Sequence, residues 1–333
     1  MLSRAFTKRR RSIKDGEHTK FSRSIHEYDD YIVGFTYDLP LISCENRGVQ
    51  MTMKEVLRSS VGVMGESSLG MTEKVVLLNG EMFAVKRFRK LIVGRSEFGR
   101  RVEKLAQLSR KCEYLVPITA YLYAKRIKFI LCDYYPMGSL ADLLACGRKH
   151  GHTALNWNQR LKIILQVARA IFFIHTECPA NERNMQMSVH GNIKSSNVMI
   201  NIDFSACLSD YGFTQLAERL EVYGASQTKP PSLSEYIYNE DLSQKSDLFD
   251  FGVVVMDILA GSRFPWLKTK CILENKEDIK EGKIEFFEFT VEGKERKRAM
   301  QVLDIALACT NRLPEARPSI EQVLLFLGDV INK

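Results

Sequence analysis

The chain has 333 residues, a formal net charge of +8, and apolar and charged fractions of 45% and 26%, which are typical of a globular protein. It has no run of about 18 apolar residues and no apolar stretch behind its charged start, so we expect neither a membrane span nor a secretory signal. Its eight cysteines form no C-x-x-C pair, which predicts buried, reduced thiols and argues against a zinc site or other structural metal.

Most of the positive charge lies near the amino-terminus. Residues 1–23 hold eight basic and two acidic residues, a net +6, and residues 1–50 are polar without periodicity, so we predict a flexible basic tail over 1–50. Its cluster from Lys8 to Arg11 could bind an anionic membrane surface, direct nuclear import, or simply be solvated. Nucleic-acid binding is the weakest hypothesis, because no aromatic-studded basic face accompanies the tail.

The next part of the chain, residues 51–133, is predicted to form short strands and one long helix. Asn79-Gly80 lies between two strand patterns and is a strong hairpin signal. In chain order the predicted elements are a helix within 49–64, strands at 74–80 and 81–88, a helix at 95–110, and strands at 115–125 and 126–135.

Helices dominate the prediction from Gly138 onward. The segment 246–261 is apolar nearly all round, which is typical of a buried helix. A small β-rich half before a larger helical half predicts an α+β fold of two lobes, residues 51–133 and 134–333, with a cleft between them. The other helices are predicted at 156–177, 296–311 and 319–331.

Two segments of the smaller half suit phosphate binding. In MGESSLGMTEKVV, Gly65 and Gly70 fit a glycine-rich loop whose bare backbone approaches phosphates, although Ser67 takes the place of the middle glycine. Lys86, in the string AVK on the following strand, suits a lysine that holds phosphates as a point charge. Each segment alone fits an ordinary hairpin turn or a solvated strand lysine equally well or better.

The strings HGNIKSSN, from His190 to Asn197, and SDYG, from Ser209 to Gly212, complete an ordered set. This set resembles the catalytic loop and D-F-G element of protein kinases, in the form seen in plant leucine-rich-repeat receptor-like kinases. YYPMGSLADLL, QKSDLFDFGVVVMDILAG and EARPSIEQVL resemble the hinge, the buried central helix and the last helix of that family. The resemblance runs from about Gln50 to the carboxyl end and implies a bilobal protein-kinase fold.

The resemblance implies which residues would bind a nucleotide, with ATP and Mg²⁺ as cofactors. Asn197 and Asp210 match the two metal ligands, with Tyr211 in place of the phenylalanine of D-F-G. Lys194 matches the lysine near the transferred phosphate, and Cys132 falls at the gatekeeper position before the hinge. The residues at nucleotide-binding positions are Gly65, Ser67, Gly70, Ala84, Lys86, Asp133, Tyr134 and Met199.

The resemblance also implies structural roles for five residues. His190 and Tyr211 match members of the packed column that links the two lobes. Asp247 matches the buried-helix aspartate that anchors the catalytic loop, and Glu235 and Arg317 match a buried salt bridge in the larger lobe.

Two catalytic positions depart from the family. Asn192 replaces the aspartate that accepts the substrate proton, and the loss of a general base raises the barrier by roughly 3–5 kcal/mol. Arg101 replaces the helix glutamate that pairs with Lys86. Two cations at that distance repel, so we expect Arg101 to turn outward and to pair with Glu97, four residues earlier.

Two further motifs are also incomplete. Gly191 replaces the arginine of H-R-D, and only Glu235 remains of A-P-E. Together the departures predict a catalytically impaired pseudokinase that binds ATP weakly and acts as a signalling scaffold or allosteric partner of active receptor-like kinases. The alternative is an atypical active Ser/Thr kinase. We expect partners among other kinases or receptor complexes, and a cytoplasmic location, at the inner face of the plasma membrane if the tail binds lipid.

Overall fold

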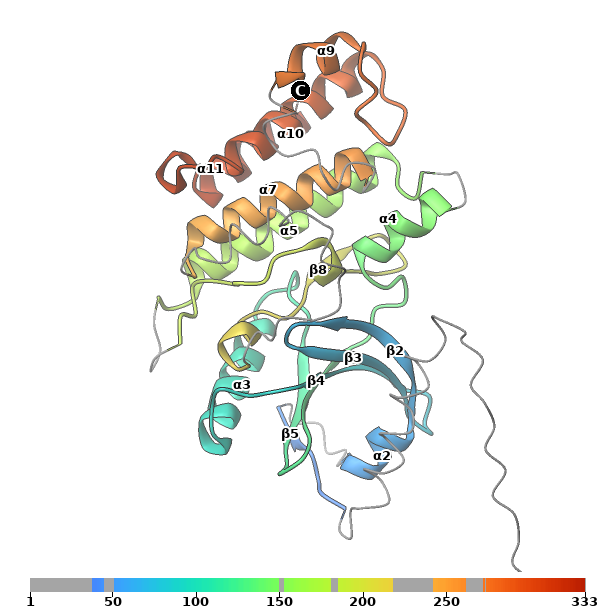
Figure 1. The fold of residues 1–333 in the computed structure, drawn as a ribbon, viewed down its shortest axis with the longest axis vertical. Helices are drawn as coiled ribbons and strands as arrows, with labels where there is room; N and C mark the ends of the chain where they lie inside the picture. The colour runs from blue at the N-terminus through green and yellow to red at the C-terminus, as the bar shows by residue number, and fades with distance from the viewer. Residues whose placement is uncertain are drawn as a thin grey trace, which may run out of the picture.

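The molecule is an α+β fold of two stacked lobes, a small one built on a β-sheet and a larger helical one (Figure 1). None of the helices in the described parts of the chain has the length and apolar character needed to span a membrane. The computed structural model describes residues 38–44, 51–149, 153–180, 185–217, 242–261, 272 and 274–332.

Six antiparallel strands form the sheet of the small lobe, in the order β1-β5-β6-β4-β3-β2. The predicted hairpin joins β3 to β4 at Asn79-Gly80, where Gly80 has a φ of 85° that other residues rarely adopt. The register places Thr72 opposite Lys86. The strands are β1 Ile42–Ser43, β2 Ser60–Ser67, β3 Gly70–Val76, β4 Met82–Phe88, β5 Ile118–Tyr123 and β6 Lys128–Asp133.

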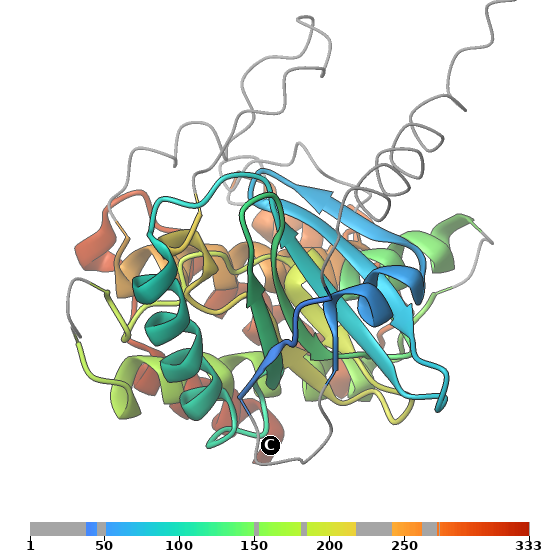
Figure 2. The ribbon, with the colours of Figure 1, turned by 90° about the horizontal axis from the view of Figure 1, so that it is seen from below.

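Two helices lie on opposite sides of this sheet (Figures 1 and 2). Helix α2, Met53–Arg58, begins with a capping box between Thr52 and Glu55 and packs its buried side chains into a cluster with β3, β4 and β6. Helix α3, Arg95–Ser109, packs against β5, where the Phe98 and Tyr121 rings meet edge-on at 5.9 Å. The two helices therefore cover parts of the two faces of the sheet.

Strand β1 lies inside residues 1–50, the predicted basic tail. Ile42 and Ser43 pair with Tyr121 and Ala120 of β5, so the prediction of a flexible tail is wrong for residues 38–44. A two-residue strand is too short to show an alternating pattern, and its pairing partner lies almost 80 residues later in the chain. Residues 1–37 and 45–50 lie outside the described parts of the chain.

The large lobe is built around α5 and α7, which pack side by side at its centre (Figure 1). Asn156 and Ser243 cap their amino-termini through capping boxes. The predicted helices of this lobe coincide with observed ones to within a few residues. The elements are α4 Leu140–Lys149, α5 Trp157–Glu177, β7 Val198–Ile200, β8 Ala206–Leu208, α7 Gln244–Ala260, α9 Lys276–Glu281, α10 Gly293–Cys309 and α11 Ile320–Asn332.

One hydrophobic core joins the two lobes. It runs from α3 through Tyr211 and Phe213, which follow β8, to α5 and α7. The Phe213 ring lies edge-on to Phe88 of β4 at 5.7 Å. The short segments η1, Ser195–Asn197, and η2, Phe213–Gln215, are 3₁₀ turns on either side of the β7–β8 hairpin. The packed core therefore positions the chain that lines the cleft.

Candidate functional site

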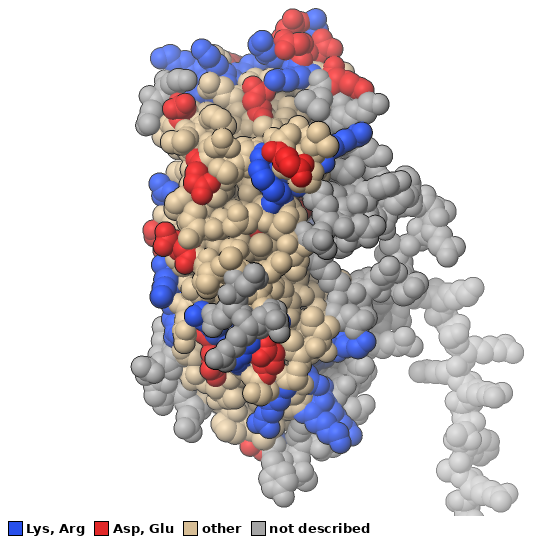
Figure 3. Space-filling view, turned by 90° about the vertical axis from the view of Figure 1, so that its left-hand side faces the viewer, with Lys and Arg blue, Asp and Glu red and all other residues tan. Residues whose placement is uncertain are grey.

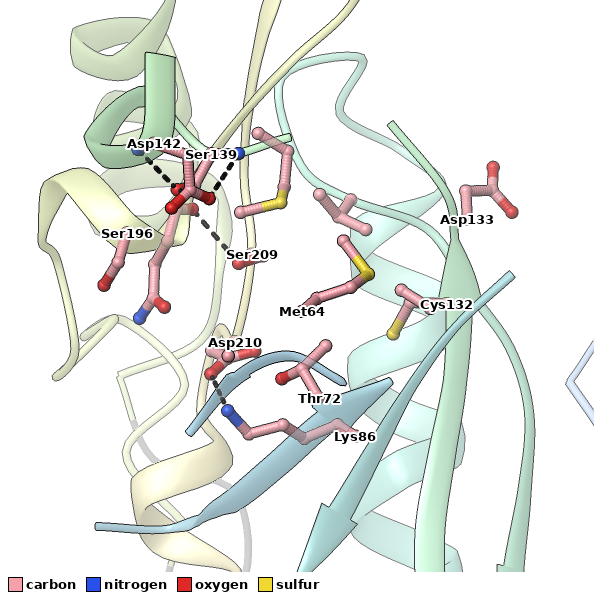
Figure 4. Close-up of a pocket in the computed structure, with 15 residues that line it drawn as sticks. Met64, Thr72, Lys86, Cys132, Asp133, Ser139, Asp142, Ser196, Ser209 and Asp210 are labelled. Atoms are coloured by element: carbon pink, nitrogen blue, oxygen red, sulfur yellow. Dashed lines mark hydrogen bonds and ion pairs between the residues drawn. The ribbon is translucent and has the colours of Figure 1, made fainter. Parts of the chain in front are cut away.

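A cavity of about 170 Å³ opens between the lobes (Figure 4). The alternation of β3 and β4 points Thr72, Ala84 and Lys86 into it, and the segments around β7 and β8 supply its other wall. The predicted nucleotide and metal residues that line it are Gly65, Ala84, Lys86, Asp133, Met199, Asn197 and Asp210, together with the gatekeeper Cys132.

Three predicted nucleotide residues do not line the cavity itself. Ser67 lies behind Lys86 at the end of β2, and Gly70 begins β3 opposite Phe88. Tyr134 turns its ring toward Lys74, whose Nζ lies 4.4 Å from the ring centroid. The structure thus brings together most of the predicted site and leaves these three at its margin.

Lys86 and Asp210 form an ion pair across the cavity (Figure 4). Lys86 Nζ lies 3.0 Å from Asp210 Oδ2, and the two side chains are only 8% and 11% exposed. Lys86 Nζ also donates to Ser67 Oγ at 3.3 Å. Asp210 has a φ of 63°, a left-handed conformation that is strained for a residue with a side chain and is typical of functional sites. The lysine therefore has an acidic partner even though α3 offers it none.

The catalytic loop is held from below by Asp247 of α7. The Asp247 carboxylate is fully buried and accepts hydrogen bonds from the backbone N–H groups of His190 at 2.7 Å and Gly191 at 2.8 Å. His175 Nε2 lies 3.0 Å from the same carboxylate. Burial lowers the pKa of His190 despite the nearby Asp247 charge, so its neutral Nδ1 accepts the Asn192 N–H at 3.1 Å. The loop is therefore preorganised.

Asn192 stands on this loop with an amide group and no carboxylate. Its backbone carbonyl accepts a hydrogen bond from Asn197 Nδ2 at 2.8 Å, which leaves the Asn197 amide oxygen for another partner. An amide cannot accept a proton at neutral pH, so Asn192 cannot serve as a general base. Lys194, two residues later, is half-buried on the same loop.

Arg101 of α3 is buried and makes two strong contacts. Its Nε lies 2.5 Å from Glu97 Oε1, so the predicted pairing with Glu97 is confirmed. The predicted outward turn is wrong, because the side chain is only 10% exposed and Nη1 donates to the backbone carbonyl of Gln215 at 2.8 Å. Hydrogen bonds from Arg100 and Arg101 hold the pKa of Glu97 below its usual range. The other nearby acid, Glu103, accepts a hydrogen bond from the Tyr121 hydroxyl at 2.7 Å.

The geometry matches known proteins at the level of sequence and of fold. The model of the protein kinase domain family matches residues 59–325. The chain belongs to this family. The predicted resemblance to plant receptor-like kinases is also confirmed, because the curated relatives are receptor-like kinases of Arabidopsis thaliana.

Several of these relatives carry names that describe inactive kinases. One is a "probable inactive receptor kinase", 29% identical over 303 residues, which cover 87% of this chain and 46% of the relative. Another is an "inactive leucine-rich repeat receptor-like serine/threonine-protein kinase", 32% identical over 84% of this chain and 42% of the relative. This kinase domain therefore spans less than half the length of these relatives.

The solved structures that share the fold include a pseudokinase domain and a kinase domain. The pseudokinase domain of BIR2, an immune regulator of the RLK/Pelle family, is 24% identical with a TM-score of 0.70, and the match covers 88% of this chain and 90% of that one. The kinase domain of maize SIRK1, bound to AMP-PNP, is 26% identical with a TM-score of 0.70, and the match covers 87% and 99%. The bilobal kinase fold predicted from the sequence is confirmed.

The remaining predicted residues have structural roles in the kinase domain. Tyr211 packs 6.0 Å from the His190 ring, and its hydroxyl donates to the Met187 carbonyl. Arg317 is buried and donates to the carbonyls of Asn311 and Lys245 at 2.8 and 2.9 Å. Glu235, its predicted partner, lies outside the described residues, so that salt bridge stays a prediction.

The sequence analysis did not identify some residues that line the kinase cleft. Thr72 lies two residues after Gly70 on the same face of β3, so strand alternation identifies it. Ser139 and Asp142 at the rim cap each other at the start of α4, with Ser139 Oγ donating to Asp142 Oδ2 at 2.6 Å; the S-x-x-D spacing is the signal. The role of the Gln215 backbone carbonyl could not be predicted from the sequence, because every residue has a backbone carbonyl.

The donor set at one end of the cavity fits Mg²⁺. Asn197 offers an amide oxygen and Asp210 a carboxylate, and Mg²⁺ is usually held by one or two carboxylates together with phosphate oxygens. Such an ion would supply charge neutralisation at the phosphates. Asp210 Oδ2 contacts Lys86 Nζ at 3.0 Å, so Lys86 and the ion would share this carboxylate.

Proposed function

We propose that this kinase domain is a pseudokinase, which transfers no phosphate at a significant rate and acts by binding other proteins. The observation that carries the proposal is the catalytic loop itself. It is anchored by Asp247 in an ordered conformation, yet it presents the amide of Asn192 where the reaction needs a proton acceptor. General-base help contributes about 10²–10⁴ in rate, which corresponds to roughly 3–5 kcal/mol of barrier.

The surroundings of Lys86 support the same proposal. In an active kinase a helix glutamate pairs with the lysine that positions the phosphates. In this chain Arg101 occupies that helix position and is engaged with Glu97 and Gln215, while Lys86 depends on Asp210. One acid would then have to serve both the lysine and a metal ion, so the phosphates would be poorly positioned.

We further propose that the domain acts as a scaffold or allosteric partner of active receptor-like kinases. The names of the inactive relatives support this role, as does the likeness to BIR2, which is described as an immune regulator. A nucleotide would enter the cleft between the lobes, and the AMP-PNP bound to the SIRK1 kinase domain supports that site. ATP and Mg²⁺, the latter through Asn197 and Asp210, would bind weakly.

We propose a cytoplasmic site of action at the inner face of the plasma membrane, and the receptor-like kinase relatives support it. The basic tail is the proposed contact with anionic lipid, through Lys8 to Arg11. Figure 3 shows one face of the molecule, where Lys and Arg lie beside Asp and Glu in several places, with uncharged surface between these groups. This mixed surface favours protein partners over nucleic acid.

The test is a radiolabel transfer assay on the full chain with ATP and Mg²⁺, with an Asp210→Ala variant as the background. Incorporation equal to that background supports a pseudokinase, and incorporation well above it supports the atypical active kinase. The second arm asks whether the chain binds the kinase domain of an active receptor-like relative and changes its transfer rate. No binding and no change would reject the scaffold role.

A further inference from the structure

The two lobes differ in net charge. In the small lobe, the described residues up to 133 hold 16 basic and 9 acidic side chains, a net +7. The described residues from 134 onward hold 16 basic and 19 acidic side chains, a net −3. The lobes lie at opposite ends of the long axis of the molecule (Figure 1), so the charge is distributed unevenly along that axis.

Much of the positive charge of the small lobe lies at one end of its sheet, where β4, α3 and the β5–β6 turn meet. The ring of Phe98, on the first turn of α3, lies 6.0 Å from Phe88 of β4 and 5.5 Å from Tyr123 of β5. The register of β4 and β6 places Arg87 opposite Phe129, so the end of β4 and the β5–β6 turn are neighbours. We call this surface the basic end, and its basic residues are Arg89, Lys90, Arg95, Lys125, Arg126 and Lys128.

The acidic residues beside the basic end do not cancel its charge. Glu66 pairs with Arg89, which is one of the six basic residues. Glu97, on the first turn of α3, is held by Arg100 and Arg101, which are not among the six. The basic end therefore keeps a net positive charge.

The basic end also presents an apolar side chain to solvent. Ile92, in the connection from β4 to α3, is 59% exposed. Its N–H donates to the Leu216 carbonyl at 3.0 Å, and Leu91 forms an antiparallel bridge with Ala217. These contacts hold the backbone in place while the Ile92 side chain stays outside. An apolar side chain beside basic ones favours the interface of an anionic bilayer.

We infer that the basic end of the small lobe contacts an anionic lipid surface and orients the domain with its large lobe away from the membrane. At an ionic strength of about 0.15 M, screening extends over roughly 8 Å, so the charges at the contact decide the binding and not the net charge of the chain. Each basic residue near the lipid contributes about fivefold in affinity.

A flat surface suits the basic end because its residues come from three exposed segments, whereas the cavity between the lobes is lined by other residues. The inference rests on the proposed location at the inner face of the plasma membrane. It goes beyond that proposal by assigning a contact to the folded domain in addition to the tail.

The test is co-sedimentation of the full chain with phosphatidylcholine vesicles, with and without about one-third phosphatidylserine. The double variant Lys125→Glu and Arg126→Glu changes two exposed residues of the β5–β6 turn and should weaken binding to the anionic vesicles by at least about tenfold. The matched control, Lys294→Glu and Lys297→Glu, makes the same change of charge on α10 of the large lobe and should change binding by less than about twofold.

Melting temperatures show whether these variants are folded. If the first double variant is unfolded, Lys125→Gln and Arg126→Gln replaces it and should weaken binding by at least about fivefold. Equal losses in the small-lobe and large-lobe variants would overturn the inference, because the lipid would then respond to net charge alone.

A second measurement reports the orientation. Ile92→Trp places an indole at the basic end, and its fluorescence should shift to shorter wavelength when anionic vesicles are added. Ile202→Trp is the matched control, because Ile202 is 71% exposed in the β7–β8 turn of the large lobe, and its fluorescence should not shift. A shift in the control and none in Ile92→Trp would mean that the opposite end of the domain faces the lipid.

A variant of the tail separates this inference from the proposed tail contact. Changing each residue from Lys8 to Arg11 to Gln should weaken binding, and the remaining binding should still require phosphatidylserine and the basic end. Loss of all binding in this variant would overturn the inference and leave the tail contact standing. Unchanged binding would reject the tail contact alone.

An acidic peptide is the other class of partner that the charge of the basic end admits. Polyglutamate in solution should not displace the chain from anionic vesicles at about 0.15 M salt. Displacement by polyglutamate, together with equal binding to vesicles with and without phosphatidylserine, would assign the basic end to an acidic protein and overturn the inference. The transfer assay judges the pseudokinase proposal independently of every result with lipid.

Discussion

Arg101 and Gln215 are joined by a hydrogen bond of 2.8 Å, from Nη1 of the arginine to the backbone carbonyl of a residue that follows Asp210 by five positions. The same segment is bound a second time, where the Ile92 N–H donates to the Leu216 carbonyl at 3.0 Å. Helix α3 is thereby tied to the chain that leaves the cleft. The residue that replaces the pairing glutamate has thus become a structural contact, and Lys86 is left to Asp210.

Removing the Arg101 guanidinium should destabilise the fold. Arg101→Met loses a buried, charged hydrogen bond to Gln215 and the pairing with Glu97, so we expect the free energy of unfolding to fall by about 1–3 kcal/mol. Arg100→Met is the matched control, because Arg100 pairs with the same Glu97 but is 27% exposed. It should change stability by less than about 0.5 kcal/mol. Urea denaturation of both variants checks this, and equal losses would contradict the structural role of Arg101.

Correcting one catalytic position should not restore phosphate transfer. Asn192→Asp returns a proton acceptor, and Arg101→Glu returns an acid near Lys86, but residues that act as one unit are strongly non-additive. The double variant should therefore give the largest gain in a transfer assay with ATP and Mg²⁺. Arg101→Glu should also lower the melting temperature, because the new carboxylate would meet Glu97 and the Gln215 carbonyl. Robust activity of Asn192→Asp alone would show that Asp210 positions Lys86 well enough.

The large lobe should depend on a buried ion pair between Arg160 and Glu288. The two charged groups lie 3.0 Å apart with side chains 0% and 3% exposed, and Arg160 Nε also donates to the Leu155 carbonyl at 2.9 Å. Arg160→Met removes the positive charge that faces the buried Glu288 carboxylate, so we expect a loss of about 3–5 kcal/mol in the free energy of unfolding.

A surface ion pair between Lys162 of the same helix and Asp203 of the β7–β8 turn provides the control for this experiment. Lys162 and Asp203 are 41% and 59% exposed, so Lys162→Met should change stability by less than about 0.5 kcal/mol. Chemical denaturation midpoints of the two variants decide the question. Similar midpoints would mean that the buried pair contributes no more than the exposed one.

Glu73 should make stability depend on pH. It is 2% exposed on β3, and burial raises its pKa from 4.5 to about 7 against the opposing effect of Arg87. Because the folded pKa is the higher one, the folded state binds more protons. The contribution of Glu73 to stability is therefore complete below about pH 4.5 and is lost as the pH rises through about 7.

The variant Glu73→Gln keeps the side chain neutral at every pH. We expect it to be more stable than the unmodified chain by about 1–3 kcal/mol at pH 8 and close to equal at pH 4.5. Denaturation curves at both pH values measure this difference. A difference of the same size at both values would show that Glu73 does not titrate in this range.

Gly191 should not tolerate the arginine of the family motif. Its φ of 74° is strained for any other residue, and a Cβ there would lie 2.6 Å from Leu242 Cδ2. Gly191→Ala and Gly191→Arg should each destabilise the fold by about 1–3 kcal/mol. Gly65→Ala is the control, since it has open space around it, and should stay within about 0.5 kcal/mol. Melting temperatures compare the three, and an unchanged value for Gly191→Arg would show that the loop adapts.

The order of the elements and the chemistry of the catalytic loop could both be predicted from the amino-acid sequence. Asn79-Gly80 specifies a hairpin and the apolar spacing of residues 156–177 specifies a helix, because turn conformation and helical periodicity are properties of neighbouring residues. The absence of a proton acceptor could be predicted from the position of Asn192 in the catalytic-loop motif alone. These three predictions depend only on which side chains are present and on their order, and both are given by the sequence.

The partners of the charged groups depend on contacts between segments that are distant in the chain. Arg101 turns inward because a carbonyl 114 residues later in the chain lies within reach, and Lys86 pairs with Asp210 because β4 and the segment after β8 face each other across the cleft. Likewise β1 exists because β5 offers it a free edge. Every residue has a backbone carbonyl, and any edge strand has unpaired backbone groups, so no pattern of side chains predicts which of them forms a contact. The packing of distant segments selects the groups that do.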